Sequence, residues 1–156
     1  MHGSRCVCVE IQALTATGFV GSAKRKSSGL DSSRLAMLIA VLEQHGGLRL
    51  ADRDVFTSVV GGLKIVEPAA DLALALSIAG AHYKRSLPPT TIAIGEVGLG
   101  GELRPATQIE QRLRESARLG YTHAIIPTSG SQKLAKIAGM ELIPVKNVSQ
   151  AIERLM

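Results

Sequence analysis

Several stretches of this chain alternate apolar and polar residues, the period of two that is typical of half-buried β-strands. In RCVCVEIQAL, residues 5–14, the side chains of Val7, Val9 and Ile11 fall on one face. A glycine pair follows one of these runs and a proline pair precedes another, and both favour turns. Further strands are predicted at residues 54–60, 91–99, 123–127 and 141–145.

Helical periodicity marks other parts of the chain. In residues 32–45, leucine and isoleucine recur three and four positions apart, which predicts a helix with one apolar stripe. Asp31 or Ser32 can cap its first turn, and Gly46-Gly47 ends it. Further helices are predicted at residues 68–79, 107–119, 131–138 and 148–155.

The stretch VVGGLKIVEPAADLALALSIAG, residues 59–80, joins a strand, a glycine turn and a helix. Pro68 suits the first turn of a helix. The residues after it are apolar nearly all round, so we expect this helix to be buried. LKIV, after the glycine pair, is expected to resume the strand. Residues 15–29 are glycine-rich and predict a second strand or a long hairpin with a basic tip.

The order of these elements predicts the fold class. The first half is rich in strands, the second half alternates helices with strands, and no linker divides them. We therefore expect one domain over residues 1–156, of the α/β class (α+β type), with a mixed sheet covered by helices. Since 46% of the residues are hydrophobic but only 3% aromatic, the core is expected to be aliphatic.

The formal net charge of +5 permits an anionic partner. Lys24, Arg25 and Lys26 are consecutive cations among glycine and serine. We predict that they and Arg34 contact the phosphates of a nucleic acid; the alternative is a basic loop that only faces solvent. A second group of cations is instead expected to pair with Glu110 and Glu115 along a helix: Arg112, Arg114 and Arg118.

The motifs of common active sites do not fit. GGLKIV lacks the glycine spacing and the Ser or Thr of a phosphate-binding loop. The histidines lie near no acidic cluster, and Cys6 and Cys8 alone supply too few ligands for zinc. We therefore expect strand cysteines with free thiols and no metal or nucleotide cofactor in this chain. A cytoplasmic location is expected, because no signal peptide or membrane span is evident.

Three motifs carry a resemblance to a known family: EPAADLA, GEVGLGGELRP and IEQRLRESARLGY. They resemble the C-terminal domain of the bacterial RadA (Sms) DNA repair proteins, which is similar to the proteolytic domain of Lon proteases. GLDSSRLAMLIAVLEQHGGL fits the same pattern, and the resemblance extends from about residue 5 to the end. It implies a Lon proteolytic-domain fold, of the type of ribosomal protein S5 domain 2.

The resemblance also locates the two positions of the Lon Ser/Lys dyad. The Lon nucleophile follows a Gly-Pro at the start of the buried helix; here Ala69 follows Pro68 and supplies no nucleophile. The Lon lysine follows a GE-x-x-P turn, and that register places Glu110 there. The resemblance thus implies a domain that is not an enzyme. Thr107-x-x-Glu110 has the spacing of a helix capping box.

RadA proteins place this domain after a zinc finger and a RecA-like ATPase in a hexamer that acts on branched DNA in recombination. The resemblance implies a scaffold and DNA-contacting domain, with single-stranded or branched DNA as partner, six copies in a ring, and no membrane. It allows a RecA-type recombinase as a further partner. ATP, magnesium and zinc would bind only in the missing N-terminal part.

The alternative is an active Lon-like serine peptidase with a displaced dyad. It would need Lys64 to meet Ser58 or Ser77. Ser77 lies within the apolar helix, where we expect its hydroxyl to bond back to the backbone.

Overall fold

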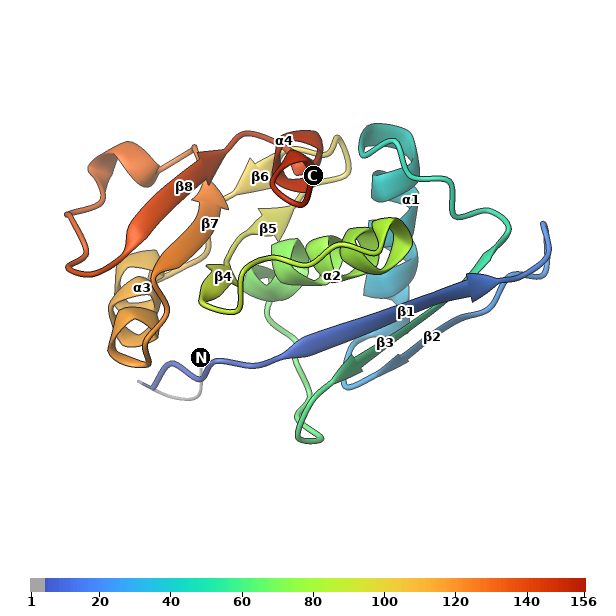
Figure 1. Cartoon of the computed structure of the whole chain (residues 1–156), viewed down its shortest axis with the longest axis horizontal. Coiled ribbons are helices and arrows are strands. Elements are labelled where there is room, and N and C mark those ends of the chain that lie inside the picture. The colour runs from blue at the N-terminus through green and yellow to red at the C-terminus, as the bar shows by residue number, and fades with distance from the viewer. Residues whose placement is uncertain (1–4) are drawn as a thin grey trace.

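Helix α2 (Asp71–Tyr83) lies at the centre of the molecule, with one group of strands on each side of it (Figure 1). This is a computed structural model, and it describes residues 5–156. Eight residues of α2 are buried, so the expectation of a buried central helix is confirmed. Pro68 starts a short 3₁₀ turn, η1 (Pro68–Ala70), which leads directly into α2.

The first sheet is built from the N-terminal third of the chain, in the order β1-β3-β2. Strand β1 runs antiparallel to the central strand and β2 runs parallel to it. Helices α1 and α2 pack against this sheet and share its aliphatic core. The bounds are Ile11–Thr17 for β1, Arg25–Ser28 for β2, Ser32–His45 for α1 and Arg53–Val59 for β3.

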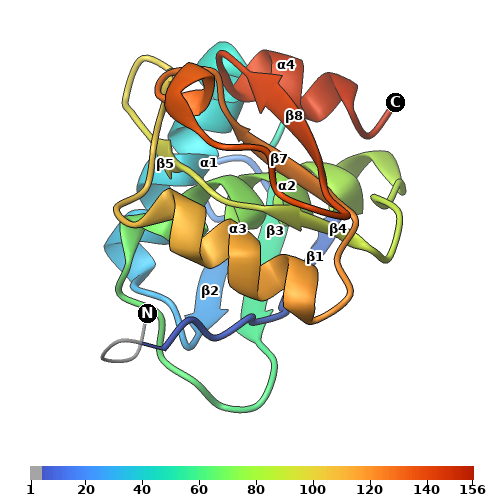
Figure 2. The same cartoon turned by 90° about the vertical axis from the view of Figure 1, so that its left-hand side faces the viewer.

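The second sheet is parallel, with the order β4-β7-β8. Figure 2 shows α3 in front of this sheet, and a second apolar cluster that includes Leu113 and Ile126 is buried there. Helix α4 packs against α2, and β5 and β6 form a small antiparallel pair. The bounds are Thr91–Ala93 for β4, Glu96–Val97 for β5, Leu103–Arg104 for β6, Ile109–Arg118 for α3, His123–Pro127 for β7, Glu141–Val145 for β8 and Val148–Glu153 for α4.

The expected α/β class, with helices packed on mixed strands, is confirmed. The strands of residues 5–156 are divided between separate sheets, however. Helix α1 has its predicted bounds, and the Asp31 carboxylate accepts a hydrogen bond from the Arg34 amide at 3.0 Å. Within the described residues, no helix is both long and apolar enough to cross a bilayer.

The capping box predicted for α3 is wrong. The helix begins at Ile109, after Gln108 in a left-handed conformation (φ 55°), and no side chain caps it. The Thr107 carbonyl accepts a bond from Arg112 at 2.8 Å, while the Glu110 carboxylate turns to Arg114. Two long-range and side-chain partners thus displace the local motif.

Three element bounds also differ from the predictions. The helix expected at residues 131–138 shrinks to the 3₁₀ turn η2 (Ser131–Lys133), because Leu134 is extended and directs the chain back to the second core. The first strand begins at Ile11 rather than at residue 5. The strand expected at residues 91–99 divides into β4 and β5.

The segment after the glycine pair is likewise not a strand: only an isolated bridge joins Ile65 to Leu30. The amide of Ile65 donates to the Gly29 carbonyl at 2.8 Å. The loop is therefore tied to the end of β2 instead of resuming β3.

Stability should fall as the pH drops below neutral because of His82, near the end of α2. Burial, reinforced by the positive charge of Arg53, lowers the pKa of this imidazole. The unfolded chain then binds a proton near the ordinary pKa of about 6.5, before the folded chain does. The free energy of unfolding should thus decrease from about pH 6.5 down to the lower folded-state pKa.

Urea titrations of the wild type and of His82→Gln at several pH values measure this effect. The substitution should flatten the pH dependence in that window. Replacing the exposed His45 by glutamine is the matched control. An unchanged slope in His82→Gln would contradict the assignment.

Candidate functional site

A buried ion pair lies directly after the position where the Lon nucleophile would stand. Asp71, in the first turn of α2, is only 3% exposed. Its carboxylate accepts two hydrogen bonds from the Arg34 guanidinium of α1, one from Nε at 2.6 Å and one from Nη2, and a third from the Val97 amide at 3.1 Å. Asp71 therefore joins α1, α2 and β5.

Protonation equilibria of this pair reflect its burial. Desolvation raises the pKa of the Asp71 carboxyl, and the hydrogen bonds from Arg34 and Val97 oppose that rise. The hydrogen bond to Asp71 raises the pKa of Arg34, so the guanidinium stays charged. Since both of its bonding edges serve Asp71, this arginine is committed to the fold.

The two positions assigned to the Lon dyad lie in different surroundings. Ala69 belongs to η1, and its carbonyl accepts a bond from the Gly95 amide at 3.0 Å. Its methyl group lines a large groove. Glu110 is an exposed residue of α3 and forms an ion pair with Arg114 at 2.6 Å. Glu110 does not line the groove.

The residues of the displaced dyad are only partly brought together. Ser77 and Lys64 both line the groove, whereas Ser58 does not. The Ser77 hydroxyl donates to the carbonyls of Ala73 and Ile11, at 2.8 and 3.1 Å. The expected back-bonding is thus confirmed, and it directs the hydroxyl proton to the backbone rather than toward a lysine.

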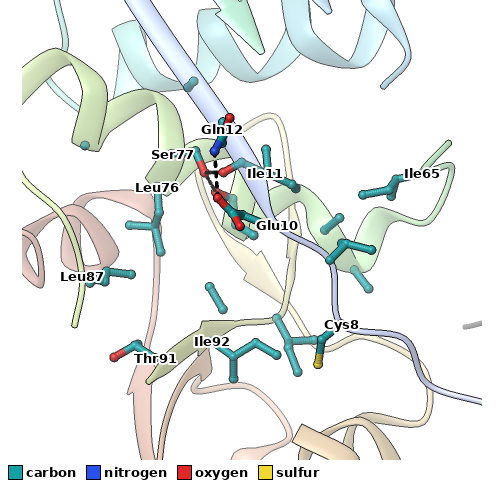
Figure 3. A pocket seen from close by; sticks show the side chains of 18 of the residues that line it. Cys8, Glu10, Ile11, Gln12, Ile65, Leu76, Ser77, Leu87, Thr91 and Ile92 are labelled. Atoms are coloured by element: carbon teal, nitrogen blue, oxygen red, sulfur yellow. Dashed lines mark hydrogen bonds between the residues drawn. The ribbon is translucent and has the colours of Figure 1, made fainter. Parts of the chain in front are cut away.

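The groove itself has a volume of about 1420 Å³. Figure 3 shows Ile11 of β1, Leu76 of α2 and Ile92 of β4 around it. Its walls are mainly aliphatic, and the loop between β3 and η1 closes one end. At that end the buried Arg112 donates to Glu67 at 2.6 Å.

The predicted phosphate-contacting residues separate by side of the strand. Lys24 and Lys26 are exposed. Arg25 turns the other way, and its guanidinium donates to the carbonyls of Leu50 and Arg53 at 2.9 and 3.2 Å. These cations therefore lie at the start of β2 rather than on a hairpin tip, and two of them project into solvent.

The second basic group behaves as expected along α3. Arg114 pairs with Glu110 at 2.6 Å and Arg118 pairs with Glu115 at 2.8 Å. Both are exposed pairs one turn apart, which contribute little to stability. Arg112 instead reaches across to Glu67, which lies 45 residues earlier in the chain.

No group of three or more metal-ligating side chains occurs in residues 5–156. Cys6 and Cys8 are free thiols, as expected, but they precede β1 instead of lying in a strand. Burial and the neighbouring Cys8 raise the pKa of the Cys6 thiol, which disfavours the reactive thiolate. Cys8 Sγ lies 3.7 Å from the Ser116 hydroxyl.

Comparisons with known proteins agree with the resemblance read from the motifs. The chain is 44% identical to the DNA repair protein RadA of Pseudomonas aeruginosa over 154 residues, which is 99% of this chain and 34% of that protein. It is 44% identical to RadA of Escherichia coli and 43% identical to RadA of Bacillus subtilis, each over 97% of this chain. The chain is homologous to one part of RadA.

That part amounts to about a third of the RadA sequences. No protein-family profile matches the chain. The RadA resemblance is therefore confirmed, while the activity and partners of complete RadA proteins are considered below.

Sequence reasoning missed two features of this region. The Asp71–Arg34 pair could have been suspected, since Asp71 is the only charged residue in an otherwise apolar run and such residues are rarely buried without a partner. The groove had no signal of its own, because its walls come from segments far apart in the sequence.

Proposed function

We propose that this chain is the non-catalytic scaffold and DNA-contacting domain of a RadA-type hexameric ATPase that acts in DNA repair and recombination, including branch migration. The observation that carries the proposal is the match of 97–99% of the chain to RadA proteins. The complete protein would bind ATP, magnesium and zinc outside this chain. A cytoplasmic location and a RecA-type recombinase as partner are part of the same proposal.

The proposed DNA contacts are Lys24 and Lys26. They are exposed, and backbone-directed cations bind nucleic acid without reading its sequence. Arg25 and Arg34 support them indirectly, because their guanidinium groups hold β2, α1 and α2 together. The net charge of +5 favours the same class of partner.

Lys24→Ala/Lys26→Ala should weaken binding to single-stranded and forked DNA. Each lost phosphate contact on a single strand lowers the slope of log K against log salt by about 0.7, so the double variant should lose about 1.4. Fluorescence anisotropy across salt concentrations measures this slope. Lys133→Ala/Lys136→Ala, at exposed cations elsewhere, is the matched control. Equal slopes for both variants and the wild type would reject the contact.

The absence of peptidase activity is supported by Ala69 at the position of the nucleophile and by the backbone bonds of Ser77. Labelled casein should remain uncut by this chain, alone or fused to an ATPase. Turnover that is abolished by Ser77→Ala or Lys64→Ala would establish the displaced dyad instead. Sedimentation of the chain tests the ring, and a hexamer would support the scaffold role.

A further inference from the structure

The groove beside α2 lies between two strands that each have an open edge. Within the described chain, β1 pairs only with β3 and β4 pairs only with β7. Both edge strands line the groove, and α2 forms its floor (Figure 3). Unpaired strand edges are templates for the addition of another strand.

The backbone of β1 is oriented for such an addition. The Val60 amide donates to the Glu10 carbonyl at 2.9 Å, and the same register pairs Gln12 with Ser58. Hydrogen bonding alternates along an antiparallel pair, so the amide and carbonyl of Ile11 and Ala13 point away from β3. The bond from Ser77 to the Ile11 carbonyl agrees with this direction. Ala13 presents its backbone groups to the groove.

The lining of the groove suits aliphatic side chains. Its floor and walls include Ala73 and Leu76 of α2 and Ile92 of β4. Tyr121 is the only aromatic residue among the described lining residues. Single-stranded nucleic acids need aromatic platforms on which the bases stack, so this surface favours a peptide. The volume of about 1420 Å³ exceeds the usual 300–1,000 Å³ of small-molecule pockets.

The rim of the groove carries an excess of positive charge. Lys64, Lys84 and Arg85 all line it and are exposed. Among residues 5–156 none of the three forms a salt bridge. Glu67 at the same rim is already bonded to Arg112. A ligand with acidic groups directed outward would complement these cations.

We propose that this groove binds an extended acidic peptide segment of a partner protein as an added β-strand between β1 and β4. Alternate side chains of a strand point to opposite faces. Apolar side chains of the peptide would pack on α2, and acidic side chains would face Lys64, Lys84 and Arg85. Residues 6–13 line one wall, so the bound segment is about eight residues long. This binding is separate from the DNA contact at Lys24 and Lys26.

The test uses a fluorescein-labelled octapeptide of alternating valine and glutamate. Fluorescence anisotropy should show saturable binding, and amide resonances of β1, β4 and α2 should shift in a ¹⁵N spectrum. Alternate N-methylation of the peptide should reduce binding at least tenfold, because it removes strand-pairing donors. An octapeptide of valine and lysine should not bind.

Lys64→Glu/Arg85→Glu should weaken peptide binding at least tenfold, while Lys133→Glu/Lys136→Glu, with the same charge change away from the groove, should not. All four positions are exposed, and circular dichroism verifies the fold of each variant. Equal affinity of the N-methylated peptide, equal effects of the two double variants, or shifts confined to other elements would each overturn the proposal.

Two other occupants are separated by the same measurements. If an octamer of thymidine shifts the groove resonances while the peptide shifts none, the groove binds nucleic acid and the proposal fails. If the peptide does not bind and Lys64→Glu/Arg85→Glu abolishes self-association in sedimentation, a second copy occupies the groove and the proposal likewise fails. Neither result depends on the DNA affinity of the Lys24→Ala/Lys26→Ala variant.

Discussion

Asp71→Ala should lower the free energy of unfolding by about 3 kcal/mol, at the lower end of the range for breaking a buried ion pair. Asp71 is 3% exposed and accepts hydrogen bonds from Arg34 and from the Val97 amide. The substitution leaves a guanidinium and an amide without their acceptor, in addition to removing a packed side chain. The Arg34 side chain is 31% exposed, so water can recover part of the loss.

Denaturant unfolding of single and double variants tests this expectation. Asp71→Asn retains an acceptor for Val97 but removes the charge, so its loss should be smaller. In a double-mutant cycle with Arg34→Met, the pair should show strong coupling. Asp52→Ala, at an exposed acid, is the control and should change stability by less than about 0.5 kcal/mol. Additive effects of the Asp71 and Arg34 substitutions would contradict the role of the pair.

Gly29→Ala should destabilise the chain by about 3 kcal/mol through two separate costs, a left-handed backbone and a steric clash. Gly29 has φ +83°, and an added Cβ would lie 2.4 Å from the Leu63 carbonyl oxygen and 2.9 Å from the Val59 Cβ. Backbone on one side and a packed strand on the other leave little room to relax. The Gly29 carbonyl also accepts the bond that anchors the loop at Ile65.

Gly47→Ala separates the two costs. Gly47 has a similar φ of +75°, but nothing lies within 4 Å of an added Cβ. It should therefore show only the backbone cost of about 1 kcal/mol. Thermal and denaturant unfolding of both variants give the difference. Equal losses at the two positions would show that the neighbourhood of Gly29 yields without cost.

The Gly29 variant also concerns the groove. Val66, in the loop anchored there, is 88% exposed and lines the groove. A shift of this loop would change the wall of the proposed peptide site. The Gly29→Ala protein should therefore bind the valine–glutamate octapeptide less tightly even where it remains folded, whereas Gly47→Ala should not.

Local patterns predicted the elements that depend on neighbours in sequence. The apolar stripe and Asp31 cap gave α1 its correct bounds, and β7 and β8 likewise agree with their predicted bounds. The ion pairs of Arg114 and Arg118 also followed from spacing, since their partners lie four and three residues away. In each case the decisive contact falls within one or two turns or strand periods.

Where distant contacts compete with local ones, the predictions were wrong. Thr107 and Glu110 have capping-box spacing, but the fold gives the Thr107 carbonyl to Arg112 and the Glu110 carboxylate to Arg114. Residues 131–138 have helical spacing, yet the chain there extends so that Leu134 packs into the second core. Burial of an apolar side chain outweighs the small free energy of a short helix.

The sequence alone determined the aliphatic core, the α/β class, the kinship with RadA and the alanine at the nucleophile position, since these rest on composition, periodicity and matched motifs. Tertiary structure alone decided which cations remain exposed for a partner. Arg34 meets Asp71 across 37 positions of the chain, and Arg25 meets Leu50 across 25. The open edges of β1 and β4 also face one groove only after both sheets pack around α2. No local pattern encodes such distances, because ion pairing and strand order depend on which elements burial brings together.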